Sequence, residues 1–331
     1  MIIRLNSNAS KAEAQLLAEQ HQAFYLFDGA HTLVTGSNVK EVPAGLIAFT
    51  EKSWTFANDM QLASRTYQAE TRRISFGKTT IGGNSQQTVL IGGPCSVESE
   101  EQLESAAQLL VTLGLNTLRG GAYKPRTSPY SFQGMGLEGL QLLAKMRDKY
   151  GLTVITEARD ATHIQEIIEH TDIIQIGAKA MYDQGILRAC AKISKPVLIK
   201  RGFGTTLQEL VQAAEFILSG GNQNVMVCER GIRTFETGTR FTLDLCGVAW
   251  LKEHTNLPVI LDPSHAMGYA YGVPSLAKAC VAMGIDGLLI ETHPNPKVAK
   301  SDASQQLTYD AFEQLYRDLQ PVAAAVGYRI V

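Results

Sequence analysis

Residues 258–265 read PVILDPSH, a short apolar run that leads directly into Asp262 and His265. An apolar run of this kind, followed at once by polar or charged residues, occurs eight times along the chain. The eight segments are VLIGGPCS (89–96), TLRGGAYK (117–124), TVITEA (153–158), DIIQIGAK (172–179), PVLIKRG (196–202), NVMVCERG (224–231), PVILDPSH and GLLIETHP (287–294). Each run is too short for a helix and lacks the polar alternation of a half-exposed strand, so each predicts a buried strand.

The stretches between these runs have the apolar spacing of amphipathic helices, for example 101–113, 137–149 and 207–218. Strand and helix therefore alternate eight times, which predicts an α/β fold, a closed (β/α)8 TIM barrel. In such a barrel the active site lies at the C-terminal ends of the strands. The polar residues that follow the eight runs are therefore the candidate functional residues.

The chain has 331 residues, about 80 more than a typical barrel, so a second small unit is expected. Residues 1–60 show strand, helix and strand patterns in the order of a ferredoxin-like α+β domain, with GLIAFTE (45–51) as a late strand. The polar residues 61–75 predict a linker, and residues 76–331 the catalytic barrel. ISFGKTTIGG (74–83) predicts a hairpin at the bottom of this barrel.

Composition narrows the class of protein further. A formal charge of −2 gives no reason to expect a nucleic acid or a membrane surface as partner. The sequence contains no apolar run of 18 residues and does not start like a signal peptide, so we expect a cytoplasmic protein. Five cysteines without a C-x-x-C pair argue against a disulfide framework and a zinc knuckle. Cys190, Cys246 and Cys280 lie in apolar helical contexts and are expected in the core.

Cations gather at one rim of the predicted barrel. They follow the predicted strands directly and comprise Arg119, Lys124, Arg126, Lys179, Lys200, Arg201, Arg230 and Arg233. Because the chain as a whole is slightly acidic, this clustering does not follow from composition. Arginine forks match phosphate and carboxylate groups, so the rim predicts a site for substrates with two or three anionic groups.

A second set of residues has the chemistry of metal ligands. Cys95, His265 and Glu291 follow the first, seventh and eighth runs, and Asp302 lies in the loop after the eighth. These strands are neighbours in a closed barrel, so the four side chains can converge. A thiolate, an imidazole and two carboxylates suit a divalent transition metal such as Mn, Fe, Co or Zn. Asp262 and His293 are candidates for orienting these ligands.

Eight phrases in order resemble one family closely: GGPCSVES, LRGGAYKPRTSPYSFQG, VITEA, IIQIGA, LIKRG, VCERGIRTFE, ILDPSHA and IETHPNPKVAKSDASQQL. The family is 3-deoxy-D-arabino-heptulosonate 7-phosphate (DAHP) synthase, of the type I beta-like group related to the 3-deoxy-octulosonate 8-phosphate synthases. The resemblance covers about residues 76–320. Residues 1–60 are similar to the ferredoxin-like regulatory extension that some members carry.

The resemblance implies a metal-dependent condensation of phosphoenolpyruvate with D-erythrose 4-phosphate, the first step of the shikimate pathway. It implies metal ligation by Cys95, His265, Glu291 and Asp302, and proton transfer by Lys124. Substrate binding would fall to Arg119, Lys124, Pro125, Arg126, Thr127, Lys179, Lys200 and Arg230, with Arg126 on the aldose phosphate. It also implies a homo-oligomer, a tetramer or a dimer. Residues 1–60, a small module joined by a polar linker, are expected to bind Tyr or Phe as an allosteric inhibitor, and a role of this module in oligomerisation stays open as the alternative.

The sequence departs from the family pattern at two places. After the fourth strand it reads Lys179–Asp183 where relatives carry Arg-Asn, and after LDPSH it reads GYAYG (268–272) where relatives carry Gly-Arg-Arg. Lys179 keeps a charge but lacks the bidentate fork of arginine. An altered substrate preference is therefore an open expectation.

Three other functions stay open at this point. One is condensation with arabinose 5-phosphate, as in the octulosonate synthases, although KPRT and LDPSH favour the four-carbon sugar. Another is a Schiff-base aldolase with Lys200 as nucleophile, its pKa depressed by Arg201. The last is a sugar-phosphate sensor without catalysis.

Overall fold

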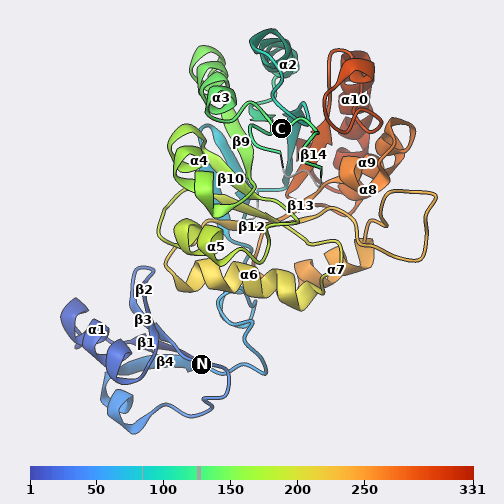
Figure 1. The fold of residues 1–331 in the computed structure, drawn as a ribbon. Helices are drawn as coiled ribbons and strands as arrows, with labels where there is room; N and C mark the ends of the chain where they lie inside the picture. The colour runs from blue at the N-terminus through green and yellow to red at the C-terminus, as the bar shows by residue number, and fades with distance from the viewer. Residues whose placement is uncertain (84, 125–127) are drawn as a thin grey trace.

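The computed structural model describes residues 1–83, 85–124 and 128–331. Within these residues, eight parallel strands form one sheet in sequence order, and the last strand pairs with the first. The predicted (β/α)8 barrel is thereby confirmed, and each predicted run contains one of its strands (Figure 1). The strands are β7 (Gln87–Gly93), β8 (Thr117–Arg119), β9 (Thr153–Ala158), β10 (Ile173–Ile176), β11 (Val197–Lys200), β12 (Val225–Glu229), β13 (Val259–Leu261) and β14 (Gly287–Glu291).

The helices cover the outside of the barrel (Figure 1). Their apolar faces pack on the sheet, as the amphipathic spacing predicts, and Ser99, Thr206 and Thr308 cap three of them through side-chain oxygens. The α-helices are α2 (Glu100–Thr112), α3 (Leu137–Tyr150), α4 (Ile164–His170), α5 (Gln184–Ala191), α6 (Leu207–Ser219), α7 (Leu245–His254), α8 (Pro263–Met267), α9 (Val273–Ala282) and α10 (Tyr309–Ala325). Short 3-10 turns are η2 (Ala161–His163), η3 (Ala270–Gly272) and η4 (Pro296–Val298).

A hairpin closes the bottom of the barrel. Strands β5 (Arg73–Phe76) and β6 (Thr79–Gly82) pair antiparallel, as predicted. Their apolar side chains join the residues inside the barrel in one buried cluster, so the hairpin acts as a plug. A two-residue strand, β15 (Arg329–Ile330), pairs with the start of β7. The closed bottom leaves the opposite end of the barrel for the site.

The first 54 residues form a separate antiparallel sheet of strand order β2-β3-β1-β4. Helix α1 follows β1, in the order of the predicted ferredoxin-like unit. The expected strand at 45–51 is wrong in its placement, because AGLIAF forms a 3-10 turn and the strand begins at Thr50. This edge strand is polar, TEKSW, and so lacks the apolar signal that prediction relied on. The elements are β1 (Ile2–Leu5), α1 (Lys11–Gln20), β2 (Phe24–Phe27), β3 (His31–Val34), η1 (Ala44–Phe49) and β4 (Thr50–Trp54).

The segment predicted as a linker is fixed to the barrel. Leu62 and Ala63 are fully buried, and the backbone N–H groups of Gln61 and Ala63 donate to Oε1 of Glu215 on α6 at 2.6 and 2.7 Å. Arg72, also buried, donates from Nε to Oδ1 of Asn256 at 2.8 Å. Polar residues here are hydrogen-bond partners of the barrel helices, which composition does not reveal. The domain limits themselves stay a prediction.

The cysteines follow the prediction with one exception. Cys95, Cys190, Cys228 and Cys280 are buried, whereas Cys246 is exposed. Helix α7 buries Val248 and Leu251, and Cys246 points to a different side of that helix. The prediction of Cys246 in the core is therefore wrong, because apolar neighbours in the sequence do not show which side of the helix a residue faces.

Among the described residues, no helix combines the length and the apolar character needed to cross a membrane.

Candidate active site

Four side chains meet at the C-terminal end of the barrel strands. Cys95 follows β7, His265 lies in α8 after β13, Glu291 ends β14 and Asp302 lies in the loop before α10. One potential ligand atom from each lies within 4.8 Å of all the others. Gly93 makes this possible for Cys95, since its φ of 141° and its closeness to the Arg119 carbonyl exclude a side chain. The structure thus brings together all four residues that the sequence predicted as metal ligands.

The side chains of this cluster are in close contact. Sγ of Cys95 lies 3.2 Å from Oδ2 of Asp302, and Nε2 of His265 lies 3.4 Å from Oε1 of Glu291 and 3.8 Å from Oδ2 of Asp302. The two carboxylates share a buried space in which each raises the free energy of the other's charge. A divalent cation between them would offset this repulsion, so the donor set fits a metal.

His265 is oriented by Asp262. Oδ2 of Asp262 lies 2.7 Å from Nδ1 of His265, and Oδ1 accepts the backbone N–H of His265 and so caps α8. Burial lowers the pKa of His265 below its ordinary value, although Asp262 and Glu291 oppose this. With Nδ1 on the carboxylate, the neutral ring directs the lone pair of Nε2 toward Glu291 and Asp302. Asp262 thus orients a ligand, as the sequence suggested.

Lys124 contacts the thiol. Its Nζ lies 3.1 Å from Sγ and 3.1 Å from the carbonyl oxygen of Cys95. Burial raises the pKa of the Cys95 thiol to about 12, with Glu291 adding to the effect. Burial acts to lower the pKa of Lys124, but Cys95 and Glu157 outweigh it and raise that pKa. Lys124 is therefore a buried ammonium group beside the proposed ligands.

An arginine and a glutamine hold Glu291. Nη1 of Arg119 lies 2.7 Å from Oε1, and Nε2 of Gln305 donates to Oε2 at 2.6 Å. The same nitrogen of Arg119 donates to the carbonyl of Pro94 at 2.6 Å. Arg119 was expected to bind substrate, but it does not belong to the described residues that line the adjoining cavity. In this structure it orients Glu291.

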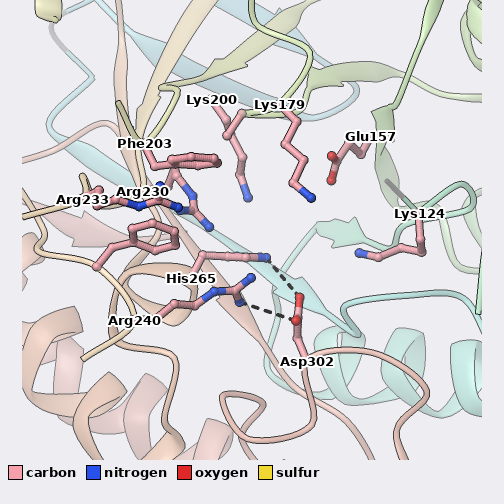
Figure 2. Close-up of a pocket in the computed structure, with 12 residues that line it drawn as sticks. Lys124, Glu157, Lys179, Lys200, Phe203, Arg230, Arg233, Arg240, His265 and Asp302 are labelled. Carbon is pink, nitrogen blue, oxygen red and sulfur yellow. Dashed lines mark ion pairs between the residues drawn. The ribbon is translucent and has the colours of Figure 1, made fainter. Parts of the chain in front are cut away.

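A cavity of about 430 Å³ adjoins the cluster. Figure 2 shows cationic side chains from several loops pointing into it. Four of the predicted substrate-binding residues line it, namely Lys124, Lys179, Lys200 and Arg230. Pro125, Arg126 and Thr127 lie outside the described residues. Of the two departures from the family pattern, Lys179 lines the cavity, whereas Tyr269 and Tyr271 are exposed and do not.

Arg230 has the features of an anion-binding group. It is buried, and its Nε and Nη1 have no hydrogen-bond partner within residues 1–83, 85–124 and 128–331. Its guanidinium lies 4.5 Å from the ring centre of Phe241, which stacks on Phe203, and Arg233 lies 4.8 Å from the ring centre of Phe203. The pKa of Arg230 is lowered by burial, which an anionic ligand would counteract. The aromatic pair thus holds two cations toward the cavity.

Lys200 and Arg201 point to different places. Nζ of Lys200 lines the cavity and lies 2.5 Å from Oδ2 of Asp262. Arg201 is buried elsewhere, where Nη1 contacts Glu229 at 2.9 Å and Asp244 at 2.8 Å. The expectation that Arg201 joins the anion rim is wrong, because consecutive residues at a strand end face opposite sides of the sheet. Arg201 is also neutralised, so it gives no support to Lys200 as a Schiff-base nucleophile.

The sequence model of the DAHP synthetase I family matches residues 65–326. The chain belongs to this family. A relative from Thermotoga maritima named phospho-2-dehydro-3-deoxyheptonate aldolase is 44% identical over 270 residues, 82% of this chain and 79% of the relative. A 2-dehydro-3-deoxyphosphooctonate aldolase from Francisella tularensis subsp. holarctica is 34% identical over 238 residues, 66% of this chain and 86% of the relative.

Solved structures support the DAHP synthetase I family over the whole chain. The crystal structure of a phospho-2-dehydro-3-deoxyheptonate aldolase (DAHP synthase) from Thermotoga maritima covers 100% of this chain and 99% of that chain, with a TM-score of 0.81 and 37% identity. A truncated form of 3-deoxy-D-arabino-heptulosonate 7-phosphate synthase from the same organism covers 82% of this chain and 98% of that one, with a TM-score of 0.76 and 40% identity. The resemblance stated from the sequence is confirmed.

Three groups of this DAHP synthetase I site were missed in the sequence. Glu157, at the end of β9, and the Phe203–Phe241 pair line the cavity. Arg240 also lines it, and its Nη1 lies 2.8 Å from Oε1 of Gln305 and 3.5 Å from Oδ1 of Asp302 (Figure 2). Glu157 could have been found, since it ends a predicted strand. Arg240 lies in a long loop after β12, where no periodic signal exists.

Proposed function

We propose that the chain condenses phosphoenolpyruvate with D-erythrose 4-phosphate and water to give DAHP and inorganic phosphate. The observation that carries this proposal is the position of Arg230, a buried cation that lines a cavity next to the Cys95–His265–Glu291–Asp302 cluster and whose Nε and Nη1 find no hydrogen-bond partner among the described residues. Such a cavity suits a phosphorylated substrate whose reacting carbon lies near a metal. Membership of the DAHP synthetase I family supports the same reaction.

We further propose that a divalent ion, Mn, Fe, Co or Zn, is held by Cys95, His265, Glu291 and Asp302. When bound, it would act as a Lewis acid on the aldehyde oxygen of the sugar phosphate. The mixed thiol, imidazole and carboxylate donors support a transition metal over Mg²⁺, which prefers oxygen ligands.

The cationic residues divide between binding and proton transfer. Arg230 and Lys200 would bind the phosphate of phosphoenolpyruvate, with Lys179 beside it, and place its carbon 3 opposite the aldehyde. Carbon 3 attacks the aldehyde carbon, water adds at carbon 2 and inorganic phosphate leaves. Lys124 is the proton donor to the new alkoxide, since its buried ammonium lines the cavity next to Cys95.

The four-carbon sugar is the preferred partner. The heptonate relative is 44% identical and the octonate relative 34%, and KPRT and LDPSH favour the same choice. Of the two departures from the family pattern, the one at Lys179 lines the described cavity. Lys179 is therefore the position at which this chain could differ from its relatives in substrate affinity.

The test is consumption of phosphoenolpyruvate by metal-reconstituted protein with either erythrose 4-phosphate or arabinose 5-phosphate, and with a chelator control. Chelator-sensitive turnover with the four-carbon sugar alone supports the proposal. Turnover with the five-carbon sugar alone would assign the octulosonate reaction. Binding of both substrates without turnover would favour the sugar-phosphate sensor.

We also propose that residues 1–60 bind an aromatic amino acid, Tyr or Phe, as an allosteric inhibitor, and that the chain forms a homo-oligomer in the cytoplasm. Ile2, Leu26 and Val34 of the N-terminal sheet belong to one buried cluster with apolar residues of the barrel, which supports coupling between the two. Inhibition of the intact chain by Tyr or Phe, lost on deletion of residues 1–60 while catalysis persists, would support regulation. Inhibition that survives the deletion would contradict it.

A further inference from the structure

We infer that Glu98 is a positioning residue that holds the Asp302 loop against the Cys95 loop and so sets the affinity of the cluster for its metal. The inference rests on the proposed metal centre. Glu98 contacts neither the cluster nor the cavity. It lies in the loop between β7 and α2, three residues after Cys95.

The Glu98 carboxylate connects the two loops. Oε1 accepts the hydroxyl of Ser96 at 3.1 Å and the backbone N–H of Lys300 at 2.9 Å. Ser96 follows Cys95 directly, and Lys300 precedes Asp302 by two residues. One oxygen therefore joins the segments that carry two of the four ligands, although these segments are 202 residues apart in sequence.

The other oxygen of Glu98 faces His293. Nε2 of His293 lies 3.6 Å from Oε2 of Glu98, and in the described part of the chain this buried nitrogen has no hydrogen-bond partner. Nδ1 of His293 accepts the backbone N–H of Asn295 at 3.0 Å, so the neutral ring carries its proton on Nε2, toward the carboxylate. His293 was a candidate for orienting a metal ligand. In the structure its Nε2 faces Glu98, so His293 would act on the cluster through Glu98.

Asp302 needs such support. Its φ is 45°, a left-handed conformation that non-glycine residues adopt at a cost in free energy. Neighbouring contacts help to hold it, since the hydroxyls of Ser96 and Ser301 lie 2.7 Å apart and the N–H of Cys95 donates to Oε1 of Gln306 at 3.0 Å. Glu98 is the charged member of this set of contacts. Its removal leaves the Lys300 N–H without its acceptor and His293 without the carboxylate that faces its Nε2.

The test measures metal affinity rather than turnover alone. Glu98→Ala should weaken binding of Co²⁺ or Mn²⁺ to the full chain by about 10- to 100-fold, the range for residues that orient metal ligands. The metal affinity of Glu98→Gln should lie between those of the wild type and Glu98→Ala. Its amide oxygen still accepts the N–H of Lys300 but presents no charge to His293. Glu100→Ala is the matched control, since Glu100 lies two residues away and pairs with Lys145 at the surface. Dissociation constants come from competition with a chromophoric chelator, and circular dichroism checks that the metal-free variants fold alike.

A double-mutant cycle separates the role of Glu98 from a general loss of order. If Glu98 acts through Asp302, Glu98→Ala should have little further effect on affinity in an Asp302→Ala background. Unchanged affinity of Glu98→Ala, or an equal loss in both backgrounds, would overturn the inference and leave the proposed function intact. A wild-type chain that binds no divalent ion would instead overturn the metal centre itself, and the role of Glu98 with it.

Discussion

His265 and Asp262 are joined by a 2.7 Å contact between Nδ1 and Oδ2, and the same carboxylate oxygen lies 2.5 Å from Nζ of Lys200. One buried carboxylate therefore connects a proposed metal ligand with a proposed phosphate-binding lysine. Burial acts to raise the pKa of Asp262, but His265 and Lys200 outweigh it and hold the pKa well below its ordinary value. The charge states of His265 and Lys200 are thus linked through Asp262.

Replacing Asp262 with Asn should weaken metal binding by about 10- to 100-fold, because the neutral amide no longer fixes the tautomer of His265. Asn still caps α8 as well as Asp, so the fold should persist. Competition with a chelator measures the affinity, and Asp318→Asn, at a half-buried position of α10 paired with Lys278, is the control. Wild-type affinity in Asp262→Asn would contradict the assignment.

Cys95→Ser should change which metals bind. Because thiolate favours soft ions, the serine variant should lose at least about 10-fold more affinity for Zn²⁺ than for Mn²⁺. The exposed Cys246 provides the control, Cys246→Ser, which should bind both ions as the wild type does. Equal losses for the two ions would show that Cys95 is not a ligand.

Arg230→Met should make the ligand-free protein more heat-stable and a poorer enzyme. The substitution removes a buried cation whose Nε and Nη1 lack hydrogen-bond partners among the residues that the structure describes, and such charges destabilise a fold. Loss of the phosphate contact should raise the KM for phosphoenolpyruvate by at least about 30-fold, from about 2 kcal/mol or more of lost binding. Thermal unfolding and steady-state kinetics measure both, with Arg317→Met on the surface as control. A lower melting temperature together with an unchanged KM would refute the role.

Glu215 predicts a pH dependence of stability. Burial raises its pKa to about 7 despite the N–H groups of Ala63 and Gln61, which oppose the shift. The folded protein therefore binds a proton at Glu215 more tightly than the unfolded chain does. The stabilisation that this proton gives the folded state is complete below about pH 4.5 and is lost as the pH rises through 7. Its upper limit is roughly 3 kcal/mol.

Glu215→Gln keeps an acceptor for both N–H groups without the charge. Its melting temperature should therefore exceed that of the wild type more at pH 8 than at pH 5. Glu51→Gln, at an exposed position of β4, should show no such difference. A constant offset between Glu215→Gln and wild type across this range would argue against the raised pKa.

The barrel and the ligand cluster could be predicted because both depend on local patterns. Each buried strand is a continuous apolar run, and each ligand except Asp302 comes within four residues of the end of such a run. Side-chain direction could not be predicted in the same way. Arg201 and Arg119 follow or end strands as Lys200 does, yet contacts with Asp244 and Glu291 remove them from the cavity. Arg240 and Glu98 were missed because they act through loops, whose conformation depends on long-range contacts.

The wide spacing of the ligands has a consequence for the newly made chain. Cys95 and Asp302 are 207 residues apart, so at 5–20 residues per second a ribosome needs roughly 10–40 seconds between them. For most of this interval the Cys95 thiol has left the peptidyl-transferase centre while all three of its partners, His265, Glu291 and Asp302, have yet to be synthesised. Loading of the proposed metal at the complete site would therefore follow synthesis of almost the whole polypeptide.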